Sequence, residues 1–471
     1  MLFVLVSCSE QEPIQIRITA TPQAVAQSEV TIEPTNTNTP LPTVVAPTDT
    51  ETTIPEPTNT SLPSVTATQV GDGRFFGPIV GADYVPPPTS TPAPALTPTP
   101  SEPSPTPIPQ TSVSTPVSDS SVYLDPEQMG IQLYYNVDID TWWQLLQRTK
   151  PMRVGWVKMQ ADWAWLQPDN AQQFDETFRL FEAHVQQAHN NGFKVLVSVA
   201  KAPAWARNGV VEEDGAPANP QDLANFITFM LDRFGEQVSG VEIWNEPNLR
   251  REWNGNLEFS GAAYMDVFRA GYNAVRAYNP NMPVITAGLA PTSTNAQLGS
   301  IDDREFLRQM YDAGLGSNDF TNIAIGVHPY GWGNPPDVRC CDAIPDRGWD
   351  DDPHFFFIET IEAYREIMVN NGDSDRQMWA TEFGWGTWSG IPNEPPDGWM
   401  LYNSVEQQAD YTIRAFEIGQ SLDYVGVMFL WNLNFANPTL VEQRNEMVSY
   451  SLFVPDQAPR PLYDRLINRP E

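Results

Sequence analysis

Two glutamates stand in matching surroundings and could together do acid/base chemistry. Glu246 lies in residues 241–248, which read VEIWNEPN, where an apolar run passes into a loop that opens on an amide and a carboxylate. Glu382 lies 136 positions later in residues 378–385, which read MWATEFGW, again at the end of a short apolar run. Carboxylates at two strand ends indicate cleavage of a glycosidic bond, in which one carboxyl group protonates the leaving oxygen and the other attacks the anomeric carbon.

A glutamate after a strand often has a simpler role as a solvated loop residue or as a charge at a helix N-terminus. The two motifs are more specific together than apart. Asn245, Glu246 and Pro247 follow an apolar run in fixed order, and Glu382 repeats the placement. We therefore expect the pair to be catalytic.

Eight short apolar runs alternate with helical patterns from residue 129 onward. The predicted strands are residues 129–134, 152–159, 194–199, 240–244, 283–287, 323–327, 377–381 and 425–430. This alternation favours an α/β fold with a parallel sheet, and eight units favour a closed (β/α)8 TIM barrel. Because the active site of such a barrel lies at the C-terminal ends of its strands, Glu246 and Glu382 would follow the fourth and seventh strands.

Helical periodicity is clear between these runs. Apolar residues recur at helical spacing over residues 174–188 and 223–234, and Gly235 follows the second stretch as a stop signal. Ser404 and Gln407 have the spacing of a capping box at the start of a later helix.

The first 120 residues differ in composition from the rest. Of the 45 prolines, 22 precede residue 122, and Thr, Ser and Pro dominate this stretch. It cannot bury enough apolar surface to offset the entropy of ordering, so residues 9–120 are predicted to be a disordered stalk. Residues 121–471 are then the catalytic domain.

Cys8 ends a short stretch, residues 5–8 (LVSC), that resembles a bacterial lipobox. The apolar lead is short and carries no Lys or Arg, so residues 1–8 are read as a truncated lipoprotein signal with Cys8 as the lipid anchor. A chance apolar N-terminus is the alternative. The anchor predicts a lipid-anchored envelope protein at the cell surface or outside the cell.

A net charge of −33 limits the partners. Nucleic acids and anionic membrane surfaces would be repelled, whereas a neutral polysaccharide would not be. We expect a carbohydrate substrate, no nucleic acid, membrane attachment only through Cys8, and a monomer.

Two further motifs have residue types suited to disulfide or metal chemistry. Cys340 and Cys341 are expected to be loop thiols, with a vicinal disulfide as the alternative, because adjacent Cα atoms lie about 3.8 Å apart, below the usual disulfide range. Residues 350–354 (DDDPH) could hold calcium, but a run of solvated acids is the commoner case. The sequence therefore predicts no metal site and no cofactor.

Four motifs resemble the clan A glycoside hydrolases, in particular their family 39 and family 5 branches. They are residues 244–248 (WNEPN), 381–385 (TEFGW), 326–330 (GVHPY) and 201–206 (KAPAWA). The resemblance implies a retaining enzyme on a (β/α)8 barrel, with the acid/base after the fourth strand and the nucleophile after the seventh.

The resemblance also implies roles for individual residues. Glu246 would be the general acid/base, Glu382 the nucleophile, and Asn245 the partner of the sugar 2-hydroxyl. His328 and Tyr330 match the His and Tyr of the clan's sixth strand, and the Tyr usually holds the nucleophile. His328 could instead be a structural histidine.

Aromatic and cationic residues complete the predicted substrate site. Trp431 matches the aromatic floor under the cleaved sugar, although it could be a core residue, and Trp205 is a further substrate-binding candidate. Lys158 stands where related enzymes often have an arginine, and Lys201 stands where a histidine often follows the third strand. About half of the loop tryptophans are expected to be further sugar platforms: Trp163, Trp165, Trp253, Trp332, Trp385, Trp388 and Trp399.

These features predict a retaining β-glycoside hydrolase that acts on a polysaccharide or oligosaccharide. A non-catalytic carbohydrate-binding cell-surface protein is the alternative, but a pure binder would need the tryptophans and not the paired glutamates. A structural cell-wall protein would explain the stalk and none of the chemistry at the strand ends.

Overall fold

The computed structural model describes residues 123–174, 176–210, 214–341 and 351–470. The predicted signal with Cys8 and the predicted stalk at residues 9–120 lie outside these ranges. No helix among the described residues is long and apolar enough to cross a membrane.

The described strands form one closed parallel barrel in chain order, with β8 pairing back to β1. They are β1 (Met129–Gln132), β2 (Trp156–Asp162), β3 (Lys194–Ala200), β4 (Gly240–Ile243), β5 (Val284–Thr286), β6 (Ile323–Val327), β7 (Met378–Phe383) and β8 (Val425–Leu430). The predicted (β/α)8 barrel is confirmed.

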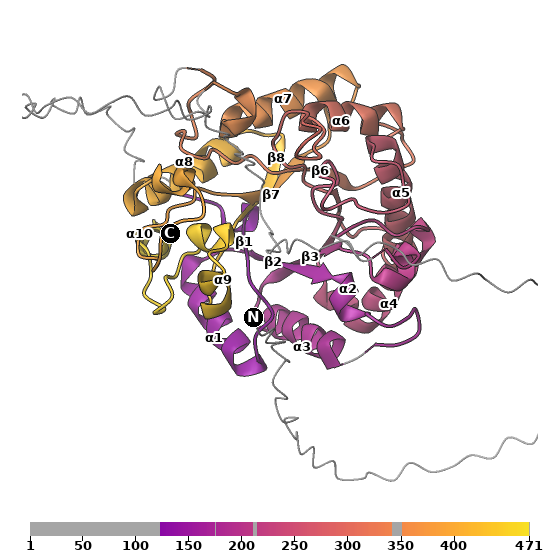
Figure 1. Ribbon diagram of the computed structural model, residues 1–471, viewed down its shortest axis with the longest axis horizontal. Coiled ribbons are helices and arrows are strands. Elements are labelled where there is room, and N and C mark those ends of the chain that lie inside the picture. Colours follow the sequence, from indigo (N-terminus) through magenta and orange to yellow (C-terminus); the bar gives the residue numbers. More distant parts are fainter. Residues whose placement is uncertain (1–122, 175, 211–213, 342–350, 471) are drawn as a thin grey trace, which may run out of the picture. The chain divides into compact units, whose positions relative to one another are not determined.

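Helices surround the strands in chain order from α3 through α8 (Figure 1). The α-helices are α1 (Ile139–Thr149), α2 (Trp163–Leu166), α3 (Glu176–Asn190), α4 (Pro220–Phe234), α5 (Gly261–Tyr278), α6 (Asp303–Asp312), α7 (Phe357–Asn370), α8 (Val405–Ser421), α9 (Pro438–Glu442) and α10 (Pro461–Asn468). Short 3-10 helices are η1 (Pro126–Gln128), η2 (Lys150–Met152), η3 (Ala204–Arg207), η4 (Gly235–Gln237), η5 (Pro353–Phe355), η6 (Gly398–Leu401) and η7 (Glu446–Tyr450).

The local signals for the helices are largely confirmed. Helix α4 ends at Phe234, and Gly235 follows with a φ of 59°. Helix α8 begins with the predicted capping box, in which Ser404 accepts from the Gln407 amide and the Gln407 side chain accepts from the Ser404 amide.

The predicted second strand was displaced. Residues 150–152 form η2 instead, with Pro151 in its first turn, and Arg153 follows with a φ of 50°. A left-handed residue cannot continue a strand, so β2 begins only at Trp156 and runs to Asp162. This shift places Lys158 in the middle of β2.

Alternation along β2 directs Trp156 and Lys158 into the barrel interior, one above the other. The Trp156 ring packs against Trp379 and Phe429, with ring centroids 5.3 and 6.2 Å apart, and these rings fill the lower part of the barrel. Lys158 therefore lies one layer closer to the C-terminal ends of the strands.

Strand β7 contains an irregularity that aims its glutamate inward. Trp379 faces the interior, whereas Phe383 packs on Phe416 of α8, outside the barrel. Register shifts against β8 lie between Met378 and Ala380 and between Ala380 and Phe383. Such an irregularity re-aims side chains, and it lets Glu382 share the interior with Trp379 although three positions separate them.

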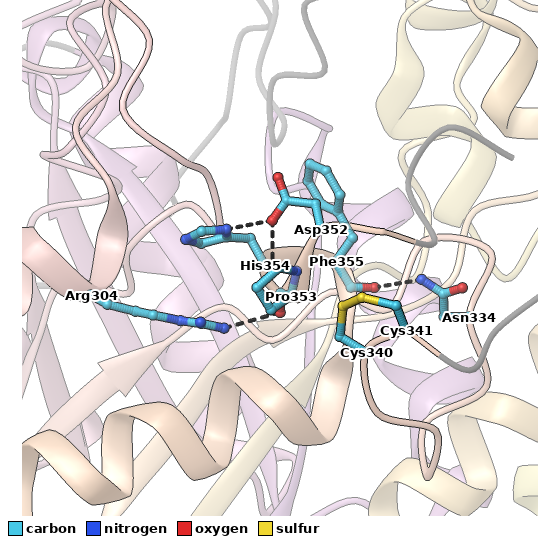
Figure 2. Close-up of a disulfide and its surroundings, with 8 residues drawn as sticks. All are labelled: Arg304, Asn334, Cys340, Cys341, Asp352, Pro353, His354 and Phe355. Carbon is cyan, nitrogen blue, oxygen red and sulfur yellow. Dashed lines mark hydrogen bonds and ion pairs between the residues drawn. A yellow bond between two sulfur atoms is a disulfide. The ribbon is translucent and has the colours of Figure 1, made fainter.

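The prediction that Cys340 and Cys341 are free thiols was wrong, because they form a disulfide (Figure 2). The prediction took their Cα atoms to be about 3.8 Å apart, as in an ordinary chain, whereas they lie 3.0 Å apart here.

Arg460, directly before α10, is hydrogen-bonded to the loops that follow β7 and β8. It is buried, and its guanidinium donates hydrogen bonds to the carbonyls of Ser449, Ser451, Thr387 and Ser389. Burial lowers the pKa of Arg460 to about 9. The charge is thus kept in the interior by bonds to carbonyl dipoles.

Replacing Arg460 by Leu should destabilise the domain by roughly 3 kcal/mol, because buried carbonyls would lose their donors. Urea unfolding followed by circular dichroism measures the loss. Arg179→Leu is the matched control, since Arg179 is exposed and pairs only with Glu176 of the same helix among its described ion pairs. Its effect should stay within about 0.5 kcal/mol, and an equal effect of the two substitutions would contradict this role for Arg460.

Candidate active site

Glu246 and Glu382 meet at the C-terminal ends of the strands. Glu246 follows β4, and Glu382 is the penultimate residue of β7. A carboxylate oxygen of each and a ring nitrogen of His328 all lie within 4.8 Å of one another. Only 2% of Glu246 and 5% of Glu382 is exposed, so both carboxyl groups are held in a largely dehydrated environment.

The loop that carries Glu246 has an unusual backbone. Trp244 and Glu246 have positive φ angles of 78° and 42°, which non-glycine residues seldom adopt. Their amides donate to the carbonyls of Val199 and Gly288, at 2.9 and 3.0 Å. Strain of this kind persists only where neighbouring structure enforces it, and it is concentrated at functional sites.

Glu382 is held through both of its carboxylate oxygens. The ammonium of Lys158 lies 3.2 Å from Oε1, and the hydroxyl of Tyr330 donates to Oε2 at 3.0 Å. Nδ1 of His328 lies 4.0 Å from Oε2. These contacts fix the orientation of the Glu382 side chain.

Lys158 contacts a second buried carboxylate. Its Nζ lies 2.9 Å from Oε2 of Glu242 on β4 and donates to the carbonyl of Thr381 at 3.1 Å. Burial alone would lower the pKa of Lys158, but Glu242 and Glu382 raise it above its ordinary value. Burial would likewise raise the pKa of Glu242, but Lys158 and then His328 lower it. Lys158 therefore stays positive between two negative groups.

Glu246 has a different set of partners. Oε1 lies 3.0 Å from Nδ1 of His328, and Oε2 lies 3.6 Å from a guanidinium nitrogen of Arg251. Gly288 at the end of the β5 segment makes room for the imidazole, because a Cβ at that position would meet His328 at 2.1 Å. The two glutamates thus share His328 but differ in every other polar contact described above.

A cavity of about 170 Å³ opens above the glutamates. It is lined by Gln132, Leu133, Tyr134, Tyr135, Asn136, Gln160, Asp162, Trp165, Lys201, Asn245, Glu246, Glu252, Glu382, Trp431, Phe435 and Met447. Asn245 is buried, and its Oδ1 has no hydrogen-bond partner among the described residues. This oxygen is therefore available to a ligand hydroxyl.

The predicted site residues fall into three groups. Asn245 and Trp431 line the cavity together with the glutamates. Lys158, His328 and Tyr330 lie behind that lining and contact the glutamates. Trp205 does not line the cavity, and its indole N–H donates to the carbonyl of Gln167 at 2.9 Å.

Trp431 was expected to be either a floor for the cleaved sugar or a core residue, and its position fits both roles. It lines the cavity, yet it is buried and its ring lies 5.0 Å from the ring of Tyr450 and 6.0 Å from that of Tyr330. Among the loop tryptophans, Trp165 is 41% exposed and lines the cavity, whereas the other six are buried. The expectation that about half of them are sugar platforms was too high, because these six are packed. Trp332, Trp388 and Trp399 pack in one aromatic cluster, and the main core contains Trp163, Trp253 and Trp385.

Sequence reasoning missed four charged residues of the site: Glu242, Arg251, Glu252 and Glu446. Glu242 had a usable signal, because it is a charge within the apolar run of β4. Glu446 had none, since it lies in η7 beyond the last strand.

Two of these carboxyl groups have pKa values well above the ordinary value of a glutamate. The pKa of Glu252 and that of Glu446 are raised to about 8 each, mainly by burial; the nearby Arg251 opposes the shift and the carboxyl group of Glu246 adds to it. Glu252 also faces Lys201, which lowers its pKa, and Asp214, which raises it. The surroundings of Glu252 and Glu446 therefore favour the neutral form of these two acids.

The buried Glu446 should make the protein less stable as pH rises from about 4.5 to about 8. Its pKa is about 8 in the folded state against an ordinary value of 4.5, so the folded state holds the extra proton in this window. The variant Glu446→Gln should gain stability relative to wild type at pH 8 and not at pH 4.5. Urea unfolding across this range measures the difference.

The matched control for this experiment is Glu236→Gln, because Glu236 is exposed. Its stability should track the wild type at every pH. A wild type and a Glu446→Gln variant with the same slope against pH would contradict the neutral state of Glu446.

Comparison with known proteins identifies the family of the chain. The profile of the cellulase family, glycosyl hydrolase family 5, matches residues 120–416. No curated protein matches the chain.

Among solved structures, a family 39 glycoside hydrolase from the gut symbiont Bacteroides cellulosilyticus WH2 is similar, with a TM-score of 0.53 and 18% identity. The match covers 74% of this chain and 64% of that one. Cel5A from Thermotoga maritima, solved in complex with cellobiose, has a TM-score of 0.46 and 12% identity, over 72% of this chain and 97% of that one. The first of these likenesses shows a shared barrel fold, and the profile match shows that the chain belongs to the cellulase family, glycosyl hydrolase family 5.

Proposed function

We propose that the protein is a retaining β-glycoside hydrolase in which Glu246 is the general acid/base and Glu382 the nucleophile. The observation that carries this proposal is the separation of at most 4.8 Å between a carboxylate oxygen of Glu246 and one of Glu382. Retaining enzymes hold their carboxyl groups about 5 Å apart, whereas inverting enzymes need about 6.5–9.5 Å to admit a water molecule.

In the first step, an oxygen of Glu382 forms a bond to the anomeric carbon while the bond to the leaving oxygen breaks. Glu246 gives its proton to that oxygen. Lys158 and Tyr330 support this division because they hold Glu382 as an oriented carboxylate. His328, at 3.0 Å from Oε1 of Glu246, holds the side chain that is proposed to give this proton.

In the second step, water attacks the anomeric carbon and the bond to Glu382 breaks. Glu246 is now a carboxylate and takes the proton of the attacking water. Two inversions at one carbon leave the β configuration unchanged. Asn245 is placed to accept a hydrogen bond from a sugar hydroxyl through its unpartnered Oδ1.

The substrate class we propose is a neutral β-linked polysaccharide or oligosaccharide. The cavity presents aromatic rings, among them Tyr135, Trp165, Trp431 and Phe435, and such rings stack on sugar faces. The chain's strong negative charge opposes an anionic polymer. The lipid anchor at Cys8 and the cell-surface location remain predictions, because Cys8 lies outside the described residues.

A non-catalytic carbohydrate-binding protein is the second candidate. It would need the aromatic lining and Asn245, but not a buried network of Lys158, Glu242 and Glu382. Burying such charges costs free energy that binding alone does not require. Turnover of a panel of aryl β-glycosides distinguishes the two candidates, since a binder would show none.

The two glutamates should respond differently to azide. Glu382→Gly should abolish turnover, and azide should restore it with an α-glycosyl azide as product, because azide takes the place of the nucleophile in one inversion. Glu246→Ala should lose about 10²- to 10⁴-fold on substrates with poor leaving groups and should form a β-glycosyl azide. Proton NMR of the products identifies the anomer.

The same anomer from both variants would contradict this assignment of roles. Fresh wild-type product that is initially the α anomer would contradict retention. Circular dichroism of each variant checks that the barrel is folded.

Trp165 should act as a sugar platform away from the reacting bond. Trp165→Ala should raise KM roughly three- to tenfold with little change in kcat, because stacking on one aromatic ring contributes about 0.5–1.5 kcal/mol. Steady-state kinetics on an oligosaccharide measures both constants. Trp143→Ala is the matched control, since Trp143 is 51% exposed on α1 and does not line the cavity. Equal effects of the two substitutions would refute the platform role.

A further inference from the structure

A second cluster of ligand-type side chains lies apart from the catalytic glutamates. Asp302 caps α6 and Asp303 is the first residue of that helix, whereas Asp352 caps η5 and His354 lies within it. Nε2 of His354 lies 2.9 Å from Oδ2 of Asp302 and 3.4 Å from Oδ1 of Asp303. Nδ1 of His354 faces Asp352 at 2.6 Å (Figure 2). One imidazole thus stands among three carboxyl groups from two connections of the barrel.

Asp303 is the independent sign that this cluster takes a ligand. It is 0% exposed, and neither of its carboxylate oxygens has a hydrogen-bond partner among the described residues. Tyr364, whose hydroxyl is also buried, faces the carboxyl group of Asp303. Arg304, the next residue, donates instead to the carbonyl of Pro353 at 3.0 Å. Burying such a carboxylate is costly, and its 3.4 Å separation from Nε2 of His354 is longer than an ordinary hydrogen bond.

We propose that Nε2 of His354, Oδ2 of Asp302 and Oδ1 of Asp303 bind a divalent transition-metal ion, with zinc as the best match. An imidazole ligand favours zinc and its neighbours, whereas calcium prefers a shell made only of oxygens. Ligands about 2.0–2.1 Å from a tetrahedral zinc lie about 3.3–3.4 Å apart. The distance from Nε2 of His354 to Oδ1 of Asp303 already has this value. The distance from the same nitrogen to Oδ2 of Asp302 would have to increase by a few tenths of an ångström.

Asp352 completes the site without binding the metal. Metal-bound histidines commonly donate their other ring N–H to a carboxylate, which fixes the tautomer and the orientation of the ring. Asp352 occupies that position at Nδ1. Zinc takes the place of the proton at Nε2, and that proton leaves to solvent.

The metal has a structural role, because the cluster joins two connections that flank the catalytic centre. Ile301, next to Asp302, exchanges hydrogen bonds of 2.9 and 3.0 Å with Asn248, two residues after Glu246. On the other side, the carbonyl of Phe355, next to His354, accepts from Asn334 at 2.9 Å. A bound ion would fasten the β5–α6 and β6–α7 connections to each other beside the loop of the acid/base.

The test is uptake of Zn²⁺ by the full-length chain after dialysis against a chelator. Calorimetric titration should show one site per chain that Asp303→Asn and His354→Gln each abolish, and the melting temperature of wild type should rise with Zn²⁺. Asp352→Asn should weaken binding about 10- to 100-fold without abolishing it. Glu246→Gln with Glu382→Gln is the control, because these glutamates and His328 are another set of closely spaced ligands. That double variant should still bind one Zn²⁺.

The proposal can be tested even if the single variants do not fold, because the ion can be located in the wild-type protein. Crystals soaked in Zn²⁺ should show an anomalous difference peak at bonding distance from Nε2 of His354. A folded wild type that takes up no Zn²⁺, with an unchanged melting temperature, would overturn the proposal in favour of a protonated His354 between its carboxylates. Uptake of Ca²⁺ but not Zn²⁺, or uptake lost only in the double glutamate variant, would also overturn it.

Discussion

The ion pairs of Lys158 with Glu382 and Glu242 are the interaction on which the candidate site depends. All three groups are buried inside the barrel, where removal from water is costly for each charge. A single ammonium can lie near two carboxylates at once, at 2.9 and 3.2 Å, without the planar geometry that an arginine would demand. Strands β2, β4 and β7 must therefore keep their relative heights, because a displacement of one strand would separate the charges.

The rest of the barrel interior follows from this requirement. The aromatic layer of Trp156, Trp379 and Phe429 fills the space beneath Lys158 and excludes water from below. The irregularity in β7 turns Glu382 toward the ammonium while Phe383 remains in the outer core. Packing and electrostatics thus select the same arrangement of strands.

The two glutamates differ because their surroundings differ. Glu382 lies against a buried cation and a phenol, whereas Glu246 lies against His328 with neutral acids nearby. Separate environments are what allow two carboxyl groups to act as nucleophile and as acid in one turnover. In the proposed mechanism, Glu246 gives its proton to the leaving oxygen as Glu382 forms the covalent bond, and it later takes a proton from the attacking water.

Much of this could be predicted from the sequence, because apolar runs and their polar ends are local signals. The eight strands, the placement of Glu246 and Glu382 and the capping box at Ser404 all follow from residues a few positions apart. The residues that were missed depend on contacts between distant segments. Glu446 reaches the site from beyond β8, and nothing in its neighbours indicates burial.

The burial of loop tryptophans and the contacts between loops could not be predicted from the sequence. Trp332, Trp388 and Trp399 lie in loops where sugar-stacking residues are expected, yet they are buried and pack together in one cluster. The joining of Asp302 and His354 depends on how two loops fold back beside each other, which no spacing in the sequence reveals. Periodicity reports which face of an element is buried, and it does not report what a loop touches.

Covalent trapping tests the central claim most directly, because it identifies the atom that attacks the sugar. Activated 2-deoxy-2-fluoro β-glycosides, drawn from several sugars, slow the second step more than the first and leave the glycosyl-enzyme in place. Tandem mass spectrometry of the digested protein should find the sugar on Glu382 alone, with one label per chain. A label on Glu246, or turnover of these substrates with inversion and no label, would contradict the account.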